Sequence, residues 1–166
     1  MLQLHIPKFA ELNYRQVLLS QPDTMAYNRG YRLPFAEYHP DSGCIDFPRR
    51  QWQGWYDVWI GREPERFYAY LQEGDRFVGE VNLYADTAGP EQGCYQMGIV
   101  LEAALRGRGF GAAGLELLIA KARQLGGRKL RNAFEESREA AMRLHLSAGF
   151  RKSGMDGGCC LLERIL

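Results

Sequence analysis

The most constraining feature of this sequence is a glycine-rich segment, Arg106-Gly-Arg-Gly-Phe-Gly111, which separates two apolar runs of different period. The run before it, Cys94 to Leu101, is short and of the β type, and the run from Phe110 to Leu125 has apolar residues at helical spacing. The segment is therefore predicted to be a loop that joins a strand to the start of a helix. Free backbone N–H groups at a helix start favour anions, so an anion site is expected here.

The chain before this loop is predicted to have a helical front followed by antiparallel strands. A first strand is expected at Leu2 to Ile6, a helix at Ala10 to Ser20 and a second short helix from Pro22 to about Asn28. Aromatic residues at helical spacing predict a third helix at Arg50 to Ile60. Two β-type runs, Phe67 to Gln72 and Phe77 to Tyr84, flank the turn segment Glu73 to Arg76 and predict a hairpin.

The chain after the loop is predicted to alternate between strands and helices. A strand is expected at Lys129 to Phe134, then a helix to Ala148 with Ser137 as its N-cap, then strands at Phe150 to Ser153 and Cys159 to Ile165. This order predicts an α+β fold with a mixed, mostly antiparallel sheet, a locally parallel middle and flanking helices. Residues 1–166 are expected to be one domain, with a helical part over 1–65 and the sheet over 66–166.

Composition narrows the classes of protein and of partner. The formal net charge is +1, so no overall field gathers nucleic acid or an anionic membrane surface. The sequence has neither a long apolar run nor the features of a signal peptide at Met1, so a cytoplasmic protein is expected. The four cysteines and three histidines do not form metal-ligand spacings, so neither a metal site nor a disulfide framework is expected.

Charge is nevertheless uneven around the glycine-rich segment. From Leu101 to Arg131 there are seven Lys and Arg residues and two Glu residues. A solvated helix face is one interpretation of this excess, and a site for a small polyanion at the loop is the other.

The loop has three other interpretations. Gly109-Phe-Gly111-Ala-Ala-Gly114 matches the dinucleotide-binding pattern and Glu135 follows at a suitable distance, but the chain after Gly114 is too short for a doubly wound sheet. A phosphate-binding P-loop is excluded because no Gly-Lys-Ser/Thr follows. A glycine-rich turn that binds nothing is the third interpretation.

Two blocks of the sequence resemble the GCN5-related N-acetyltransferase (GNAT) superfamily. The first is Arg106-x-x-Gly109-x-Gly111 on a strand, loop and helix. The second is Arg138-x-x-Ala141-x-x-Leu144-His145 ending in Gly149-Phe150, where the family has Asn-x-x-Ala-x-x-Leu-Tyr and then Gly-Phe. The resemblance covers Phe67 to Leu166, and it implies the GNAT fold with a splayed pair of parallel strands.

The resemblance also implies that acetyl-CoA is the cofactor. In the family, the loop amides bind the pyrophosphate, the preceding strand pairs with the pantetheine arm, and one strand amide polarises the thioester carbonyl. The matching cofactor-binding residues are Ile99, Val100, Leu101, Arg106, Gly107, Arg108, Gly109, Phe110, Gly111, Ala112 and Arg138.

Two positions depart from the family pattern. Arg138 stands where the family has asparagine, and His145 stands where the family tyrosine protonates the leaving thiolate. An imidazole can also donate a proton, so His145 is a candidate acid, with a half-buried structural histidine as the alternative. For the base, Glu80 is the first candidate, in phase with Val78 and Asn82 on one strand face. A water chain or one of Asn82, Tyr95, Glu135 and Glu136 are the other options.

The front half of the chain is expected to shape the acceptor pocket. Tyr27, Tyr31, Asp46 and Asn82 are the candidate substrate-binding residues. The function implied is acetyl transfer from acetyl-CoA to a primary amine of a small molecule. The alternatives are acetylation of a protein N-terminus or lysine and a non-catalytic acyl-CoA-binding module, and a homodimer is left open.

Overall fold

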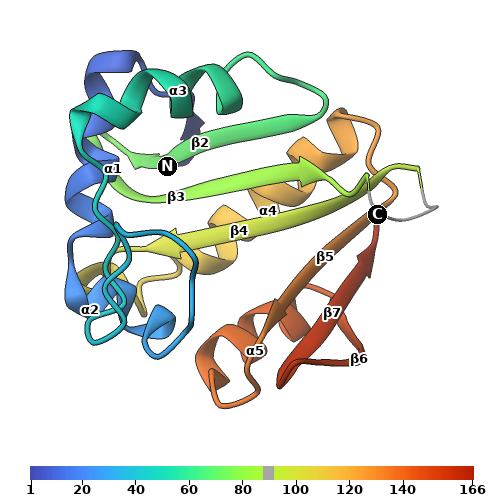
Figure 1. Ribbon diagram of the computed structural model, residues 1–166. Helices are drawn as coiled ribbons and strands as arrows, with labels where there is room; N and C mark the ends of the chain where they lie inside the picture. The colour runs from blue at the N-terminus through green and yellow to red at the C-terminus, as the bar shows by residue number, and fades with distance from the viewer. Residues whose placement is uncertain (88–91) are drawn as a thin grey trace.

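The computed structural model describes residues 1–87 and 92–166, and its strands form one sheet with helices on both faces (Figure 1). The described strands are β1 (Leu2–His5), β2 (Arg66–Glu73), β3 (Arg76–Ala85), β4 (Cys94–Leu101), β5 (Lys129–Phe134), β6 (Arg151–Asp156) and β7 (Cys159–Ile165). Their order in the sheet is β1-β2-β3-β4-β5-β7-β6. All neighbours are antiparallel except β4 and β5, which are parallel. The predicted α+β class and mixed sheet are confirmed.

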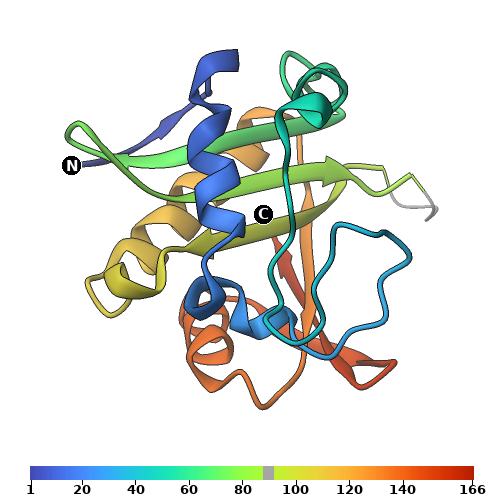
Figure 2. The same ribbon diagram turned by 60° about the vertical axis from the view of Figure 1, so that its left-hand side comes forward.

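The helices divide between the two faces of this sheet (Figures 1 and 2). α1 and α3 lie over one face, and α4 lies behind the other. The described helices are α1 (Leu12–Leu19), α2 (Pro22–Met25), α3 (Arg49–Trp59), α4 (Phe110–Gln124) and α5 (Glu139–Ser147), with short 3-10 turns η1 (Phe9–Glu11), η2 (Ala26–Asn28) and η3 (Ala103–Leu105). None of the helices in residues 1–87 and 92–166 is long and apolar enough to cross a lipid bilayer.

Two apolar clusters hold the layers together. The larger one packs α4, through Leu115, Leu118 and Ile119, against sheet residues such as Val81 and Leu130. Its members are almost fully buried, and each such side chain contributes roughly 2 kcal/mol relative to an exposed one. The smaller cluster joins α1 to α3 on the other face and comprises Leu12, Leu19, Met25, Cys44, Phe47 and Trp52.

The predicted elements occur in the predicted order, with two local corrections. Ser137 is not the N-cap of α5; Arg138 occupies that position, and its side chain makes no capping hydrogen bond. Val78 does not share a face with Glu80, because Leu71 pairs with Gly79 and Gln72 with Phe77, which leaves Val78 as the extra residue of a bulge. Val78 therefore packs in the larger core cluster.

The parallel pair β4 and β5 is in contact at one end only. Cys94, Tyr95 and Gln96 pair with Lys129, Leu130 and Arg131, and the pairing ends there. Figure 1 shows the two strands diverging from that end. The split between β4 and β5 is called the opening below.

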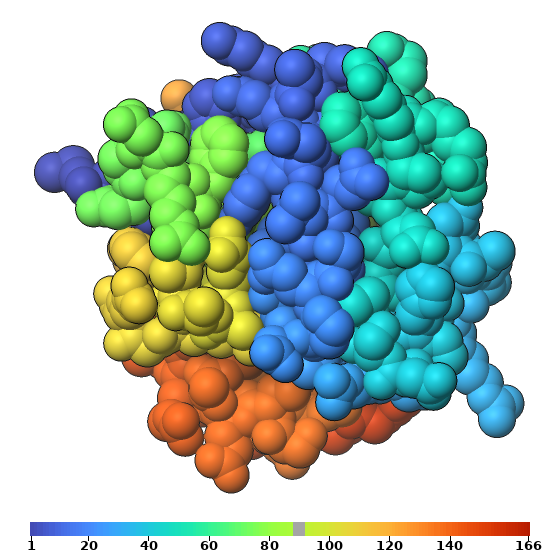
Figure 3. All heavy atoms as spheres, turned by 90° about the vertical axis from the view of Figure 1, so that its left-hand side faces the viewer, coloured from blue at the N-terminus to red at the C-terminus, as the bar shows by residue number. Residues whose placement is uncertain are grey.

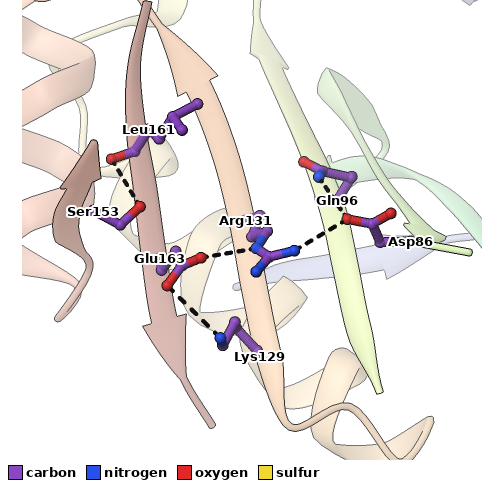
Figure 4. Close-up of polar contacts among 7 residues, drawn as sticks. All are labelled: Asp86, Gln96, Lys129, Arg131, Ser153, Leu161 and Glu163. Atoms are coloured by element: carbon purple, nitrogen blue, oxygen red, sulfur yellow. Dashed lines mark hydrogen bonds and ion pairs between the residues drawn. The ribbon is translucent and has the colours of Figure 1, made fainter. Parts of the chain in front are cut away.

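A polar network ties the strands together at the paired end of the opening (Figure 4). Arg131 on β5 donates to Glu163 on β7 at 2.8 Å and contacts Asp86, which follows β3, at 3.3 Å. Gln96 on β4 donates to the same Asp86 carboxylate at 3.2 Å. These bonds hold β3, β4, β5 and β7 in register immediately before β4 and β5 separate.

Candidate functional site

The far end of β4 turns backbone groups toward the opening that no strand within residues 1–87 and 92–166 pairs with on that side. Glu102 N–H donates to Val78 O, and Cys94 O accepts from Asp86 N–H, so the even-numbered residues of β4 direct their backbone groups to β3. Backbone groups alternate along a strand, so those of Ile99 and Leu101 face β5 beyond the point where pairing ends. An extended ligand can pair with Ile99 as an additional strand would.

The glycine-rich loop lies directly after this strand and begins α4. Gly107 and Gly109 have φ of 75° and 83°, a conformation that side chains disfavour, and a Cβ at either position would meet no atom within 4 Å. Glycine is required at both for backbone conformation, and the space beside each is open. The first α4 hydrogen bond runs from Ala113 N–H to Gly109 O, so Phe110, Gly111 and Ala112 N–H have no acceptor within the helix. These groups and the helix dipole favour an anion.

The other two glycines of the dinucleotide-like pattern serve packing. A Cβ at Gly111 would lie 3.2 Å from Leu144 Cδ2, and one at Gly114 would lie 2.7 Å from Leu71 Cδ1. Gly114 therefore lets α4 approach the sheet closely. The strand before the loop, β4, has the antiparallel β3 beside it, unlike the first strand of a dinucleotide-binding fold.

The two arginines of the loop have different environments. Arg106 Nη2 donates to Thr24 O at 2.8 Å and to Leu101 O at 3.3 Å, so it ties α2 to the loop. Thr24 Oγ1 also accepts from Ala103 N–H at 3.0 Å. Arg108 is exposed. Arg106 is exposed as well, but its guanidinium is engaged with Thr24 and Leu101, so Arg108 is the first candidate for the positive charge expected at the anion site.

Much of the charge excess between residues 101 and 131 is paired with acidic side chains elsewhere in the chain. Lys121 lies 2.9 Å from Glu63, and Arg131 and Lys129 both contact Glu163. The excess does not form one continuous polyanion site.

Arg138 faces the opening from the start of α5. Its guanidinium lies 4.6 Å from the ring centre of Tyr27 and 5.0 Å from that of Phe134, so it stacks between a front residue and β5. Burial lowers the pKa of Arg138. Burial raises the pKa of Tyr27, which the Glu80 charge raises further and the Arg138, Arg15 and Arg106 charges oppose. Tyr27 thus lies within electrostatic reach of Arg106, Arg138, Arg15 and the buried Glu80. Figure 3 shows this face, where the blue N-terminal helices meet the yellow loop region and orange α5.

His145, the predicted acid, is buried with both ring nitrogens occupied. Nδ1 lies 2.8 Å from Ala141 O, which only accepts, so Nδ1 carries the hydrogen. Nε2 then accepts from the Asn132 amide at 3.0 Å. The rings of Phe134 and Phe150 lie 5.0 Å away on either side, and burial lowers the pKa of His145. The imidazole is neutral at pH 7, and it must break one of these hydrogen bonds before it can donate outward.

Glu80, the predicted base, is buried beneath α1. One carboxylate oxygen accepts from Arg15 Nη1 and the other from the Tyr68 hydroxyl. The Arg15 guanidinium lies among the rings of Phe47, Trp55 and Tyr68. Glu80 is thus engaged in a polar cluster on β3, the strand next to β4, and it pairs in register with Val100 of β4.

The sequence did not single out Arg15 or Tyr68, although a signal was present. Arg15 is the charged residue on the helix face formed by Leu12, Leu18 and Leu19, and Glu80 is the charged residue within an apolar strand. Two opposite charges on buried faces indicate a pair, because either alone would be costly to bury.

The four predicted acceptor residues occupy different places. Tyr31 donates to Glu135, which follows β5, so the front segment bridges to the carboxyl end of that strand. Asn82 lies beside Gly98 of β4, where a Cβ would be 2.6 Å from its amide nitrogen. Asp46 is 62% exposed at its side chain and pairs with His39 at 3.0 Å. Tyr27, Tyr31 and Asn82 border the region around the opening, whereas Asp46 lies at the surface.

Solved structures of acetyltransferases share this fold. An acetyltransferase of the GNAT family from Streptococcus pneumoniae has a TM-score of 0.78 at 16% identity, with 100% of this chain and 99% of that chain covered. A spermidine N-acetyltransferase from Vibrio cholerae, solved with CoA and spermine, has a TM-score of 0.75 at 14% identity, covering 99% and 95%. A GCN5-related N-acetyltransferase from Kribbella flavida has a TM-score of 0.70 at 22% identity, covering 99% and 98%. No curated protein sequence matches the chain significantly.

The family assignment comes from the sequence match rather than from these folds. Residues 27–150, well over half of the chain, match the family described as Acetyltransferase (GNAT) family. The match spans the glycine-rich loop, the opening and the block that ends at Phe150. The chain therefore belongs to the GNAT acetyltransferase family.

Proposed function

We propose that this protein is an acetyl-CoA-dependent N-acetyltransferase that acts on the primary amine of a small molecule. The observation that carries the proposal is the continuity of two binding features. The unpaired edge of β4 at Ile99 leads directly into the free N–H groups of Phe110, Gly111 and Ala112. An elongated ligand with an extended amide-bearing arm and a pyrophosphate fits this sequence of sites.

The residues present fit coenzyme A. Gly107 and Gly109 leave space beside the backbone, so phosphate oxygens can approach the helix N-terminus closely. Arg108 supplies an exposed cation next to these groups. Ile99 offers backbone groups to the amides of the pantetheine arm. When bound, acetyl-CoA supplies the activated acetyl thioester.

The chain contributes to transfer mainly through positioning and polarisation. A backbone N–H of β4 at the opening is a preorganised donor for an oxygen that gains negative charge, an effect worth about 3 kcal/mol in other enzymes. The α1 and α2 side of the molecule holds the acceptor amine next to the thioester. An encounter between two free molecules is thereby replaced by a reaction between two oriented, bound groups.

Proton transfer has two candidate donors. His145 is the residue matched to the family tyrosine, and it requires release from Asn132 or Ala141. Tyr27 is protonated at neutral pH, because burial raises its pKa, and its hydroxyl has no hydrogen bond within residues 1–87 and 92–166. For the base, Glu80 in its cluster with Arg15 and Tyr68 is the candidate, either directly or through water.

The test is turnover with a panel of amines. Thiol release from acetyl-CoA should depend on both enzyme and amine, and mass spectrometry should detect an acetylated amine. Acetylation of peptide N-termini or lysines, with no small amine accepted, would favour a protein acetyltransferase. Binding of CoA without transfer to any amine would instead indicate an acyl-CoA-binding module.

A further inference from the structure

A cation of the chain itself occupies an aromatic cage beside the opening. The guanidinium of Arg15 lies 4.8 Å from the ring centre of Trp55, 5.3 Å from that of Phe47 and 5.4 Å from that of Tyr68. Glu80 completes the cage with an ion pair, and its side chain is only 5% exposed. This set of rings and residues is called the Arg15 cage below.

Rings around a carboxylate are the surroundings that proteins use for a substrate ammonium group. Here the same surroundings are filled by Arg15, whose side chain is 17% exposed. The carboxylate of Glu80 is already shared between Arg15 and Tyr68. A second cation at the cage would meet an existing positive charge and no free carboxylate.

One edge of the Arg15 guanidinium is left without a partner. Its Nη1 contacts the Tyr68 hydroxyl and Glu80, whereas the buried Nε has no acceptor among the described residues. A buried donor left unpaired costs about 1–3 kcal/mol. Nε and Nη2 form one side of the planar guanidinium, and this side suits the two oxygens of a carboxylate.

The cage lies at the acceptor side of the opening. Glu80 on β3 pairs in register with Val100 on β4, so the cage is one strand away from the edge of β4. The charges of Arg15, Arg106, Arg138 and Glu80 all act on Tyr27, and the Arg138 guanidinium lies 4.6 Å from its ring centre. Glu80 offsets one of these three positive charges, and the remaining two favour an anionic group over an additional ammonium.

We infer that the acceptor amine carries a carboxylate or similar anionic group, and that the free side of Arg15 binds this group. The inference rests on the proposed function and makes it more specific. The acceptor class is then an amino acid or an amino acid derivative, and a polyamine is a poor acceptor. Phe47 and Trp55 pack over Arg15 and Nε is buried, so binding through this side requires displacement of these two rings.

Matched pairs of ligands test the inference independently of turnover. The ligands are L-leucine with 3-methylbutylamine, L-phenylalanine with 2-phenylethylamine, and L-methionine with 3-(methylthio)propylamine, with spermidine as the polycation. Each is titrated into the protein saturated with CoA, which cannot transfer an acetyl group, and binding is followed by calorimetry. Tryptophan emission gives a second readout, because Trp55 lies beside Arg15.

At least one amino acid is expected to bind 10-fold or more tightly than its decarboxylated partner and than spermidine. Arg15→Lys keeps the positive charge but removes the side formed by Nε and Nη2, so it should abolish this preference. Arg143→Lys is the matched control, because Arg143 is 73% exposed and lies on α5, which contributes no residue to the cage. Its preference should equal that of the wild type.

The inference is overturned if no amino acid binds, if the decarboxylated amines or spermidine bind as well, or if Arg15→Lys keeps the preference. The comparison of ligand pairs on the wild type stands even if Arg15→Lys does not fold. Turnover of decarboxylated amines without an amino acid preference would leave the acetyltransferase proposal standing and remove this one. Amino acid binding without any acetyl transfer would support this inference and remove the acetyltransferase proposal.

Discussion

The guanidinium of Arg106 donates a 2.8 Å hydrogen bond to the carbonyl oxygen of Thr24. This bond joins the glycine-rich loop to α2, on the acceptor side of the molecule. A second bond from the same nitrogen reaches Leu101 O at 3.3 Å, at the end of β4. One side chain therefore holds together the strand edge, the loop and the front helices.

Arg106→Gln should act mainly on the stability of the fold, and less on the positive charge available at the loop. Loss of these charged hydrogen bonds should cost about 2 kcal/mol, which corresponds to a melting temperature lower by about 5 °C. Arg108→Gln is the matched control: its exposed side chain should leave the melting temperature unchanged and weaken CoA binding at low salt by about 5-fold. Thermal melts and CoA titrations of both variants check this. Equal melting temperatures for the two would contradict the structural role of Arg106.

Gly109→Ala should weaken CoA binding by 10-fold or more. Its φ of 83° costs an alanine about 1–2 kcal/mol, and the methyl group enters the open space beside the loop. Gly54→Ala is the comparison, because Gly54 lies within α3 and a Cβ there meets nothing within 4 Å. That change should stabilise the protein by about 1 kcal/mol and leave CoA affinity unchanged. Unaltered affinity in Gly109→Ala would show that the loop does not bind the cofactor.

His145→Phe should flatten the dependence of stability on pH. Burial lowers the pKa of His145 in the folded state, so the unfolded chain binds a proton more readily below pH 6.5. The stability present above that pH is therefore lost as pH falls through the folded pKa. Urea unfolding at pH 7.5 and 5.5 measures the loss, which should be smaller in His145→Phe than in the wild type. An equal loss of stability in His145→Phe and in the wild type would contradict this role of the buried imidazole.

Tyr27→Phe should lower kcat by about 10²-fold, the range of a general acid, with little change in stability. The Tyr27 hydroxyl makes no hydrogen bond within the described residues, so its removal leaves no partner unsatisfied. Tyr56→Phe removes a hydroxyl that bonds Pro7 O at 3.3 Å, away from the opening, and should leave kcat intact. An unaltered kcat in Tyr27→Phe, with a large loss in His145→Phe, would assign the proton to His145 instead.

Much of the fold followed from the spacing of apolar residues and glycines. The helix at Phe110–Gln124 and the strands Cys94–Leu101 and Lys129–Phe134 match their predicted bounds closely, because each has a clear period and a glycine or polar boundary. The prediction of Ser137 as the N-cap was wrong by one residue. Serine is a preferred N-cap residue and Arg138 is not, so the sequence does not indicate that the helix begins after Arg138. The bulge at Val78 reverses which face a residue occupies, and its sequence sign, the isolated Gly79 within the strand, was not used.

The candidate site was predictable only where the backbone forms it. Gly107 and Gly109 are needed for their backbone conformation, which a sequence can indicate, and they lie at the expected loop. The environments of side chains depend on distant segments. The contacts of Arg106 with α2, of Tyr31 with Glu135 and of Arg15 with Glu80 each join parts of the chain more than 60 residues apart. A local pattern can mark Arg15 and Glu80 as buried charges that need partners, but it does not specify which distant residues meet.

Amide hydrogen exchange with and without acetyl-CoA tests the central claim most directly. The claim is that one ligand lies along the free edge of β4 and at the start of α4. Acetyl-CoA should slow exchange at the N–H groups of Ile99, Phe110, Gly111 and Ala112, whose acceptors it supplies. Unchanged exchange at these four amides under saturating acetyl-CoA, or protection confined to other segments, would contradict the account.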